Sequence, residues 1–106
     1  MAEPVPLPIA CTLTGASLEE RAVWLRRLGE AALIDGARDG NRLDLWFRSE
    51  AEADARELVR AEGECCPFLF FEVDRSADEV HLTVTGPLEA GPVLDDMLAA
   101  LRGAYR

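Results

Sequence analysis

The sequence changes from polar to aromatic over ten residues, Glu62-Gly63-Glu64-Cys65-Cys66-Pro67-Phe68-Leu69-Phe70-Phe71. A polar stretch precedes the two cysteines, and an aromatic stretch follows them. Because a proline disfavours the α conformation of the residue before it, Pro67 predicts that a helix ends within a residue or two of Cys65. The two thiols are therefore expected where a helix gives way to a strand.

The residues before the cysteines have the pattern of an amphipathic helix. Ser49 and Glu52 have the spacing of a capping box, which predicts the start of this helix. The line of residues expected to be buried is Ala51, Ala55, Leu58, Val59, Glu62 and Cys66. Glu62 lies on that line. It is expected either to cover the edge of the apolar stripe or to form hydrogen bonds with the backbone of residues 63–68. If it were instead buried without a partner, its pKa would rise and it would be a functional candidate.

Two predicted hairpins flank this helix. Residues 33–38 and 42–48 surround an Asp39-Gly40-Asn41 turn, and residues 70–74 and 80–85 form the second pair. Alternation predicts one buried face and one outward face for the sheet. The residues expected to face inward are Leu43, Leu45, Phe47, Val80, Leu82 and Val84. Trp46 and His81 are expected on the opposite face.

The remaining elements complete the predicted fold. Ile9–Leu13 alternates like a short strand, a helix is expected from Ser17 to about Ala32, and a last helix from about Pro92 to Gly103. The order β-α-ββ-α-ββ-α predicts an α+β fold with a mostly antiparallel five-stranded sheet and helices on one face. Residues 1–8, with three prolines, are expected to form an extended N-terminal arm, and residues 9–106 a single domain.

The composition argues against several classes of partner. The net charge of -9 disfavours nucleic acid and anionic membranes, which both carry dense negative charge. The N-terminus has no basic region followed by an apolar one, and no apolar run is long enough to span a bilayer, so a cytoplasmic protein is expected. In a reducing compartment, an odd number of cysteines, three, does not indicate a disulfide framework.

One family resemblance rests on the central motif. Residues 64–71, together with Cys11-Thr12-Leu13 and Leu82–Pro87, resemble a group of small uncharacterised bacterial proteins that share a Glu-x-Cys-Cys-x-Phe-Leu-x-Phe signature. The similarity spans most of the chain. It implies the fold and the choice of cysteines, and the group is discussed beside metal-stress regulators, with no established activity to carry over.

The thiols suggest a site for a soft metal ion or metalloid, because thiolates select ions such as Hg(II), Cu(I), Zn(II) and thiophilic As(III). Adjacent cysteines alone are a poor chelate, since on a helix their side chains diverge by about 100°. Cys11, on the predicted first strand, is therefore the expected third sulfur. The predicted site comprises Cys11, Cys65, Cys66, Glu62 and Glu64, in a small accessory or sensor protein.

Three alternatives stay open at this point. In the first, the cysteines only pack, and the protein is a non-catalytic interaction domain that forms a homodimer through the open sheet face. In the second, Cys65 and Cys66 form a vicinal disulfide that acts as a redox switch. The third is an enzyme, which we disfavour, because His81 is the only histidine and is expected on the other face, and no nucleotide-cofactor fingerprint is present.

Overall fold

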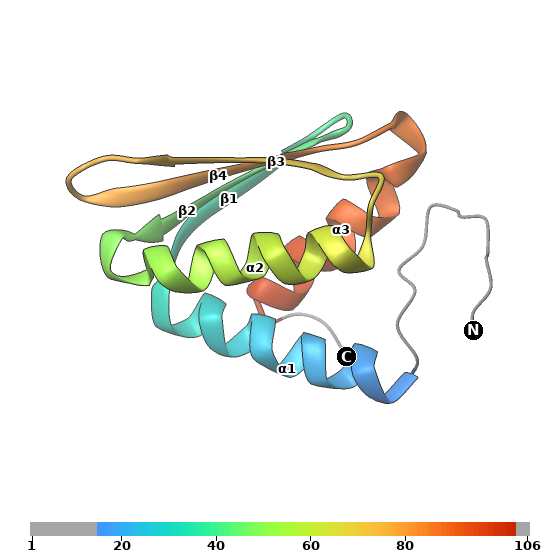
Figure 1. Cartoon of the computed structure of the whole chain (residues 1–106), viewed down its shortest axis with the longest axis horizontal. Helices are drawn as coiled ribbons and strands as arrows, with labels where there is room; N and C mark the ends of the chain where they lie inside the picture. Colours follow the sequence, from blue (N-terminus) through green and yellow to red (C-terminus); the bar gives the residue numbers. More distant parts are fainter. Residues whose placement is uncertain (1–14, 104–106) are drawn as a thin grey trace.

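The computed structural model describes residues 15–103, an α+β arrangement with helices on one side of a sheet (Figure 1). The helices are α1 (Gly15–Ala32), α2 (Glu52–Cys65) and α3 (Gly91–Leu101). The strands are β1 (Leu33–Asp39), β2 (Arg42–Arg48), β3 (Phe70–Arg75) and β4 (Glu79–Thr85). Short 3-10 turns, Ser49–Ala51 and Leu88–Ala90, precede α2 and α3.

The described residues form a four-stranded antiparallel sheet in the order β1-β2-β4-β3. The prediction of a five-stranded sheet is therefore wrong, although the α+β class is confirmed. The two hairpins meet through β2 and β4, so the central strands are paired on both sides and β1 and β3 form the edges. The predicted strand Ile9–Leu13 and the predicted arm, residues 1–8, lie outside the described residues.

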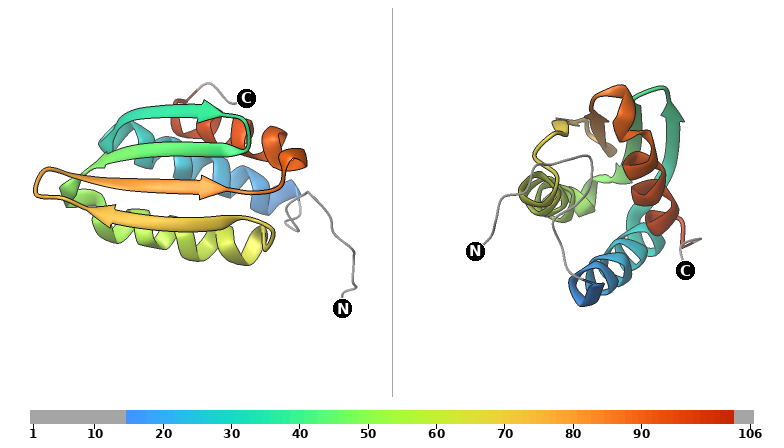
Figure 2. Two further views of the ribbon diagram at one scale, coloured as in Figure 1. Left: turned by 90° about the horizontal axis from the view of Figure 1, so that it is seen from above. Right: turned by 90° about the vertical axis from the view of Figure 1, so that its right-hand side faces the viewer.

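Both hairpins have the predicted alternation. Leu43, Leu45 and Phe47 on β2 are completely buried, as are Val80, Leu82 and Val84 on β4. The two-residue connection between β1 and β2 depends on Gly40, whose φ of 59° lies in the left-handed region that glycine tolerates. The sheet therefore has one apolar side, and the helices cover that side (Figure 2).

The helices form the rest of the core. α2 and α3 contact the strands, and α1 packs mainly against α3. A close approach makes this packing possible, because a Cβ atom placed on Gly29 of α1 would lie 1.7 Å from the carbonyl oxygen of Leu101 in α3. Leu25, Leu94 and Met97 are completely buried near this contact. None of the described helices is long and apolar enough to cross a membrane.

The predicted ends of the helices agree with the structure better than the predicted start of α2. α1 ends at Ala32 and α2 at Cys65, as predicted. The capping box expected at Ser49 is wrong, because Ser49 opens a 3-10 turn and no side chain caps α2. The turn carries the chain through residues 49–51 before the α-helix begins, so Ser49 is not at the N-cap position.

Candidate functional site

The two adjacent cysteines lie at the C-terminal end of α2. Cys65 is the last helical residue, and Cys66 leaves the helix with φ −128° and ψ 77°. The backbone N–H of Cys66 still donates to the carbonyl oxygen of Glu62 at 2.7 Å, and the N–H of Leu69 donates to the carbonyl of Cys66 at 3.0 Å. This break in the helix turns the two side chains toward each other, and their Sγ atoms are 3.6 Å apart.

Both cysteines are buried, and Cys65 is disulfide-bonded in the structure. Cys66 has no exposed surface and Cys65 has 6%. Burial, together with the nearby Glu62 carboxylate and partly opposed by Arg21, raises the pKa of the Cys66 thiol to about 11. Cys66 is therefore a protonated thiol at neutral pH. Burial is the largest cause of this shift.

Glu62 has a buried partner that the sequence analysis missed. Its carboxylate accepts two hydrogen bonds from Arg21, from Nε to Oε2 at 2.6 Å and from the terminal nitrogen Nη2 to Oε1 at 2.9 Å. The side chains are 14% exposed for Arg21 and 4% for Glu62. This bidentate pair joins α1 to α2 one turn before the thiols, so Glu62 already has a structural role.

A signal for this pair was present in the sequence. Arg21 stands four residues before Leu25 and seven before Leu28, on the line along which α1 buries its apolar residues. Glu62 stands on the corresponding line of α2. Two opposite charges on two apolar lines indicate a buried pair between the helices.

Of the predicted site residues Glu64 and Cys11, the structure describes only Glu64. The Glu64 side chain is 71% exposed and pairs with Arg60 at 3.0 Å, away from the buried sulfur atoms. This pair and the pair of Arg56 with Glu52 lie on the solvated face of the helix. Cys11 lies outside the described residues, and so its predicted approach to the other thiols stays a prediction.

The described residues place only part of the predicted metal site together. Cys65 and Cys66 are adjacent, and Glu62 is near Cys66, but its carboxylate is held by Arg21. Within residues 15–103, no group of three or more histidine, cysteine, aspartate or glutamate side chains could hold a metal ion. The disulfide of Cys65 is not the predicted vicinal one, because the Sγ atoms of Cys65 and Cys66 are 3.6 Å apart and a disulfide bond is about 2.05 Å long.

A second polar cluster lies on the sheet face opposite the helices. The rings of Trp46 and His81 are stacked, with centroids 4.7 Å apart and planes 10° apart. His81 Nε2 is 2.8 Å from Asp44 Oδ1 and 3.4 Å from Thr83 Oγ1. Hydrogen bonds from Arg42, and less strongly from His81, hold the pKa of Asp44 below its usual value.

This cluster does not have the arrangement of a catalytic triad. A triad places the carboxylate and the nucleophilic hydroxyl on different nitrogens of the imidazole. Here Asp44 and Thr83 both approach Nε2 of His81. The geometry therefore suits a rigid surface feature better than proton transfer to Thr83.

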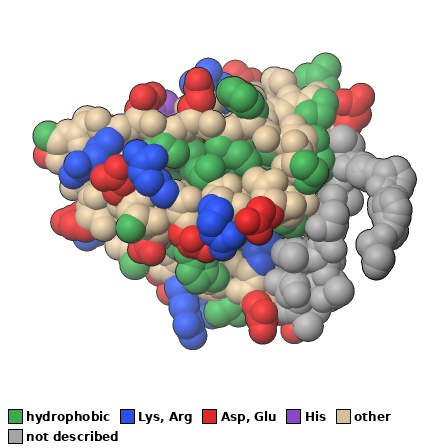
Figure 3. Space-filling view, in the orientation of Figure 1, with side chains coloured by type: hydrophobic (Ala, Val, Ile, Leu, Met, Phe, Trp, Pro, Cys, Tyr) green, Lys and Arg blue, Asp and Glu red, His purple; other side chains and the backbone are tan. Residues whose placement is uncertain are grey.

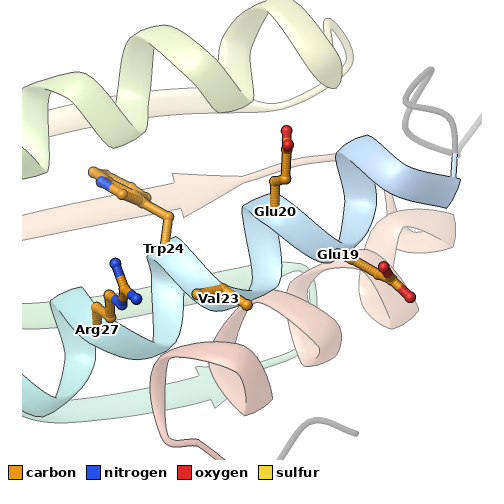
Figure 4. A pocket seen from close by; sticks show the side chains of 5 residues that line it. All are labelled: Glu19, Glu20, Val23, Trp24 and Arg27. Carbon is orange, nitrogen blue, oxygen red and sulfur yellow. The ribbon is translucent and has the colours of Figure 1, made fainter.

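An open hollow lies along α1, lined by Glu19, Glu20, Val23, Trp24 and Arg27 (Figure 4). Trp24 is half-buried and packs against the core. Glu20 and Trp24 extend from α1 in the direction of α2 (Figure 4). The hollow has two carboxylates beside one guanidinium and no cluster of metal ligands among the described residues, so its chemistry indicates no reaction.

Comparisons of the chain with protein-family models, curated proteins and solved structures found no match. The resemblance to the cysteine signature described above also stays a prediction, and Gly63 occupies the position where the signature has its glutamate. Functional inference therefore rests on the residues and their geometry.

Proposed function

We propose that the reduced protein binds a thiophilic metal ion or metalloid through Cys65 and Cys66 and acts as an accessory or sensor protein. The observation that carries this proposal is the 3.6 Å separation of the two sulfur atoms. Two thiolates on one tetrahedral zinc ion, with bonds of about 2.3 Å, are about 3.8 Å apart. The helix break at Cys66 thus places the two sulfur atoms at a separation that suits one metal ion. Adjacent cysteines inside a regular helix do not have this separation.

The surroundings support a soft ion. The two sulfur atoms are buried among apolar side chains, and these side chains would exclude water from the coordination sphere of a bound ion. Thiolate ligands select soft ions over hard ones such as Mg²⁺ or Ca²⁺. Because Cys65 is disulfide-bonded in the structure, a reductant must cleave this bond to two thiols before the Cys65 sulfur can serve as a ligand. Cys11 remains the proposed third sulfur.

The two glutamates have separate roles in this proposal. Glu62 is held by Arg21, so it shapes the site and contributes charge near Cys66 without serving as a ligand. Glu64 points away with Arg60 and is not required. This distinction makes the Glu64→Gln variant a suitable control for every binding experiment.

The test is a titration of the reduced protein with Hg(II), Cu(I), Zn(II) and arsenite while reactive thiols are counted. We expect at least one of these ions to protect two or three thiols, and Cys65→Ser or Cys66→Ser to abolish protection by that ion. Cys11→Ser would separate a three-sulfur site from a two-sulfur site, and Glu64→Gln should bind like the natural protein. Unchanged thiol counts with all four ions would reject the proposal.

A further inference from the structure

The sheet face opposite the helices is bare in the part of the chain that the structure describes (Figure 2). Strand alternation places six carboxylates on this face and two guanidinium groups, those of Arg42 and Arg48. The carboxylates are Asp35, Asp39, Asp44, Glu72, Asp74 and Glu79. Figure 3 shows acidic side chains and the histidine along the upper rim of the molecule, where the sheet lies.

The centre of this face is aromatic. The strand register aligns Asp35, Trp46, His81 and Asp74 in one row across all four strands. Trp46 and His81 form the stacked pair in the middle of the row, and one carboxylate stands at each end. Phe70, which is 65% exposed, lies on the same face of the edge strand β3, four residues along the strand from Asp74.

We propose that this face binds a cationic partner, an extended peptide segment rich in arginine. The surplus of four negative charges attracts such a segment and repels nucleic acid and anionic membranes. It also disfavours the predicted homodimer through this face, because two copies would bring like charges together. The thiol site has no part in this proposal, since no residue of the aromatic row lies next to either cysteine.

The stacked rings indicate where an arginine would bind. One face of the Trp46 indole packs on His81, so its other face is turned toward β1. The residues of β1 opposite Trp46 and Asp44 are Asp35 and the small Ala37, and both are exposed. A guanidinium stacked on the indole would gain a cation–π interaction and could pair with the Asp35 carboxylate.

The first test uses the whole protein and a short arginine-rich peptide, with a glutamate-rich peptide of equal length as the control. The indole N–H signals of Trp46 and Trp24 report on the two sides of the molecule by NMR. We expect the arginine-rich peptide to shift the Trp46 signal and leave the Trp24 signal in place. No shift of the Trp46 signal at saturating peptide would overturn the proposal, and this result needs no variant.

The second test separates a specific site from general attraction to an acidic protein. We expect Trp46→Ala, and separately the double variant Asp35→Asn/Asp74→Asn, to weaken peptide binding about tenfold. The double variant Asp54→Asn/Glu89→Gln removes the same charge from exposed positions away from the sheet and should change affinity less than about twofold.

Several results would contradict the proposal. Equal weakening in both double variants would show attraction by net charge alone. A dimer in light scattering that Trp46→Ala dissociates would assign the face to a second copy of the chain. Cys66→Ser should leave peptide binding unchanged, so failure of the thiol site and failure of this face give different results. Thermal melting of each variant checks that it is folded.

Discussion

The two sides of helix α2 hold the same residue type in opposite surroundings. Glu62 faces α1, has a 4% exposed side chain and is bound at two points by Arg21 from another helix. Glu64, two residues later, has a 71% exposed side chain and pairs with Arg60 one turn away on its own helix. The salt bridge of Glu62 therefore joins two different helices, whereas the salt bridge of Glu64 forms within α2 alone.

The difference shows that burial decides what a charged pair does. Removing one partner of a buried pair leaves an uncompensated charge in a poorly solvated place, whereas an exposed charge is simply hydrated by water. The same contrast applies to the thiols, because Cys66 shares the inward side with Glu62 and its pKa responds to that carboxylate. Three predictions test the contrast, beginning with the largest effect.

Glu62→Ala should lower the free energy of unfolding by about 3–5 kcal/mol, because it leaves the Arg21 guanidinium buried without its carboxylate. Glu64→Ala is the matched control and should cost less than about 1 kcal/mol. Urea unfolding of both variants measures the difference. Equal losses in the two variants would show that the buried pair contributes no more to the free energy of unfolding than the exposed pair.

Gly29→Ala should destabilise the fold by about 1–3 kcal/mol or more, because the new methyl group would overlap the carbonyl oxygen of Leu101 at 1.7 Å and push α1 away from α3. Gly63→Ala on α2 is the control, since its Cβ would meet only the Phe71 ring at 3.9 Å. This control should gain about 0.5–1 kcal/mol from helix propensity. Thermal melting that moves both variants in the same direction would contradict the close helix packing.

Stability should fall as the pH rises from about 9 to 11, because folding raises the pKa of Cys66 from its ordinary value of 9.0 to about 11. The folded state holds this proton more tightly, so the contribution is complete below pH 9 and is lost through pH 11. The loss is about 1–2 kcal/mol. Cys66→Ala should have a shallower pH dependence over this window, and identical slopes of unfolding free energy against pH would refute the assignment.

The sequence predicted the elements well, because their signals are local. Pro67 marked the end of α2, Gly40 marked the first turn, and the alternation of Leu43, Leu45 and Phe47 marked the buried face of β2. The number of strands in the sheet was wrong, since pairing between strands depends on residues far apart in the chain. The failed capping box at Ser49 has a different reason, because the choice between a 3-10 turn and an α-helix depends on how the chain leaves β2.

By itself, the sequence determined the helices, the hairpins and the place where two adjacent thiols leave a helix, because each depends on neighbours within a turn or a strand. Only the tertiary structure decided that Arg21 reaches Glu62 across 41 residues, that the Cys65 and Cys66 sulfur atoms lie 3.6 Å apart, and that burial keeps Cys66 protonated. The physical reason is that burial and charge pairing arise from elements packed together, and no local pattern contains that packing.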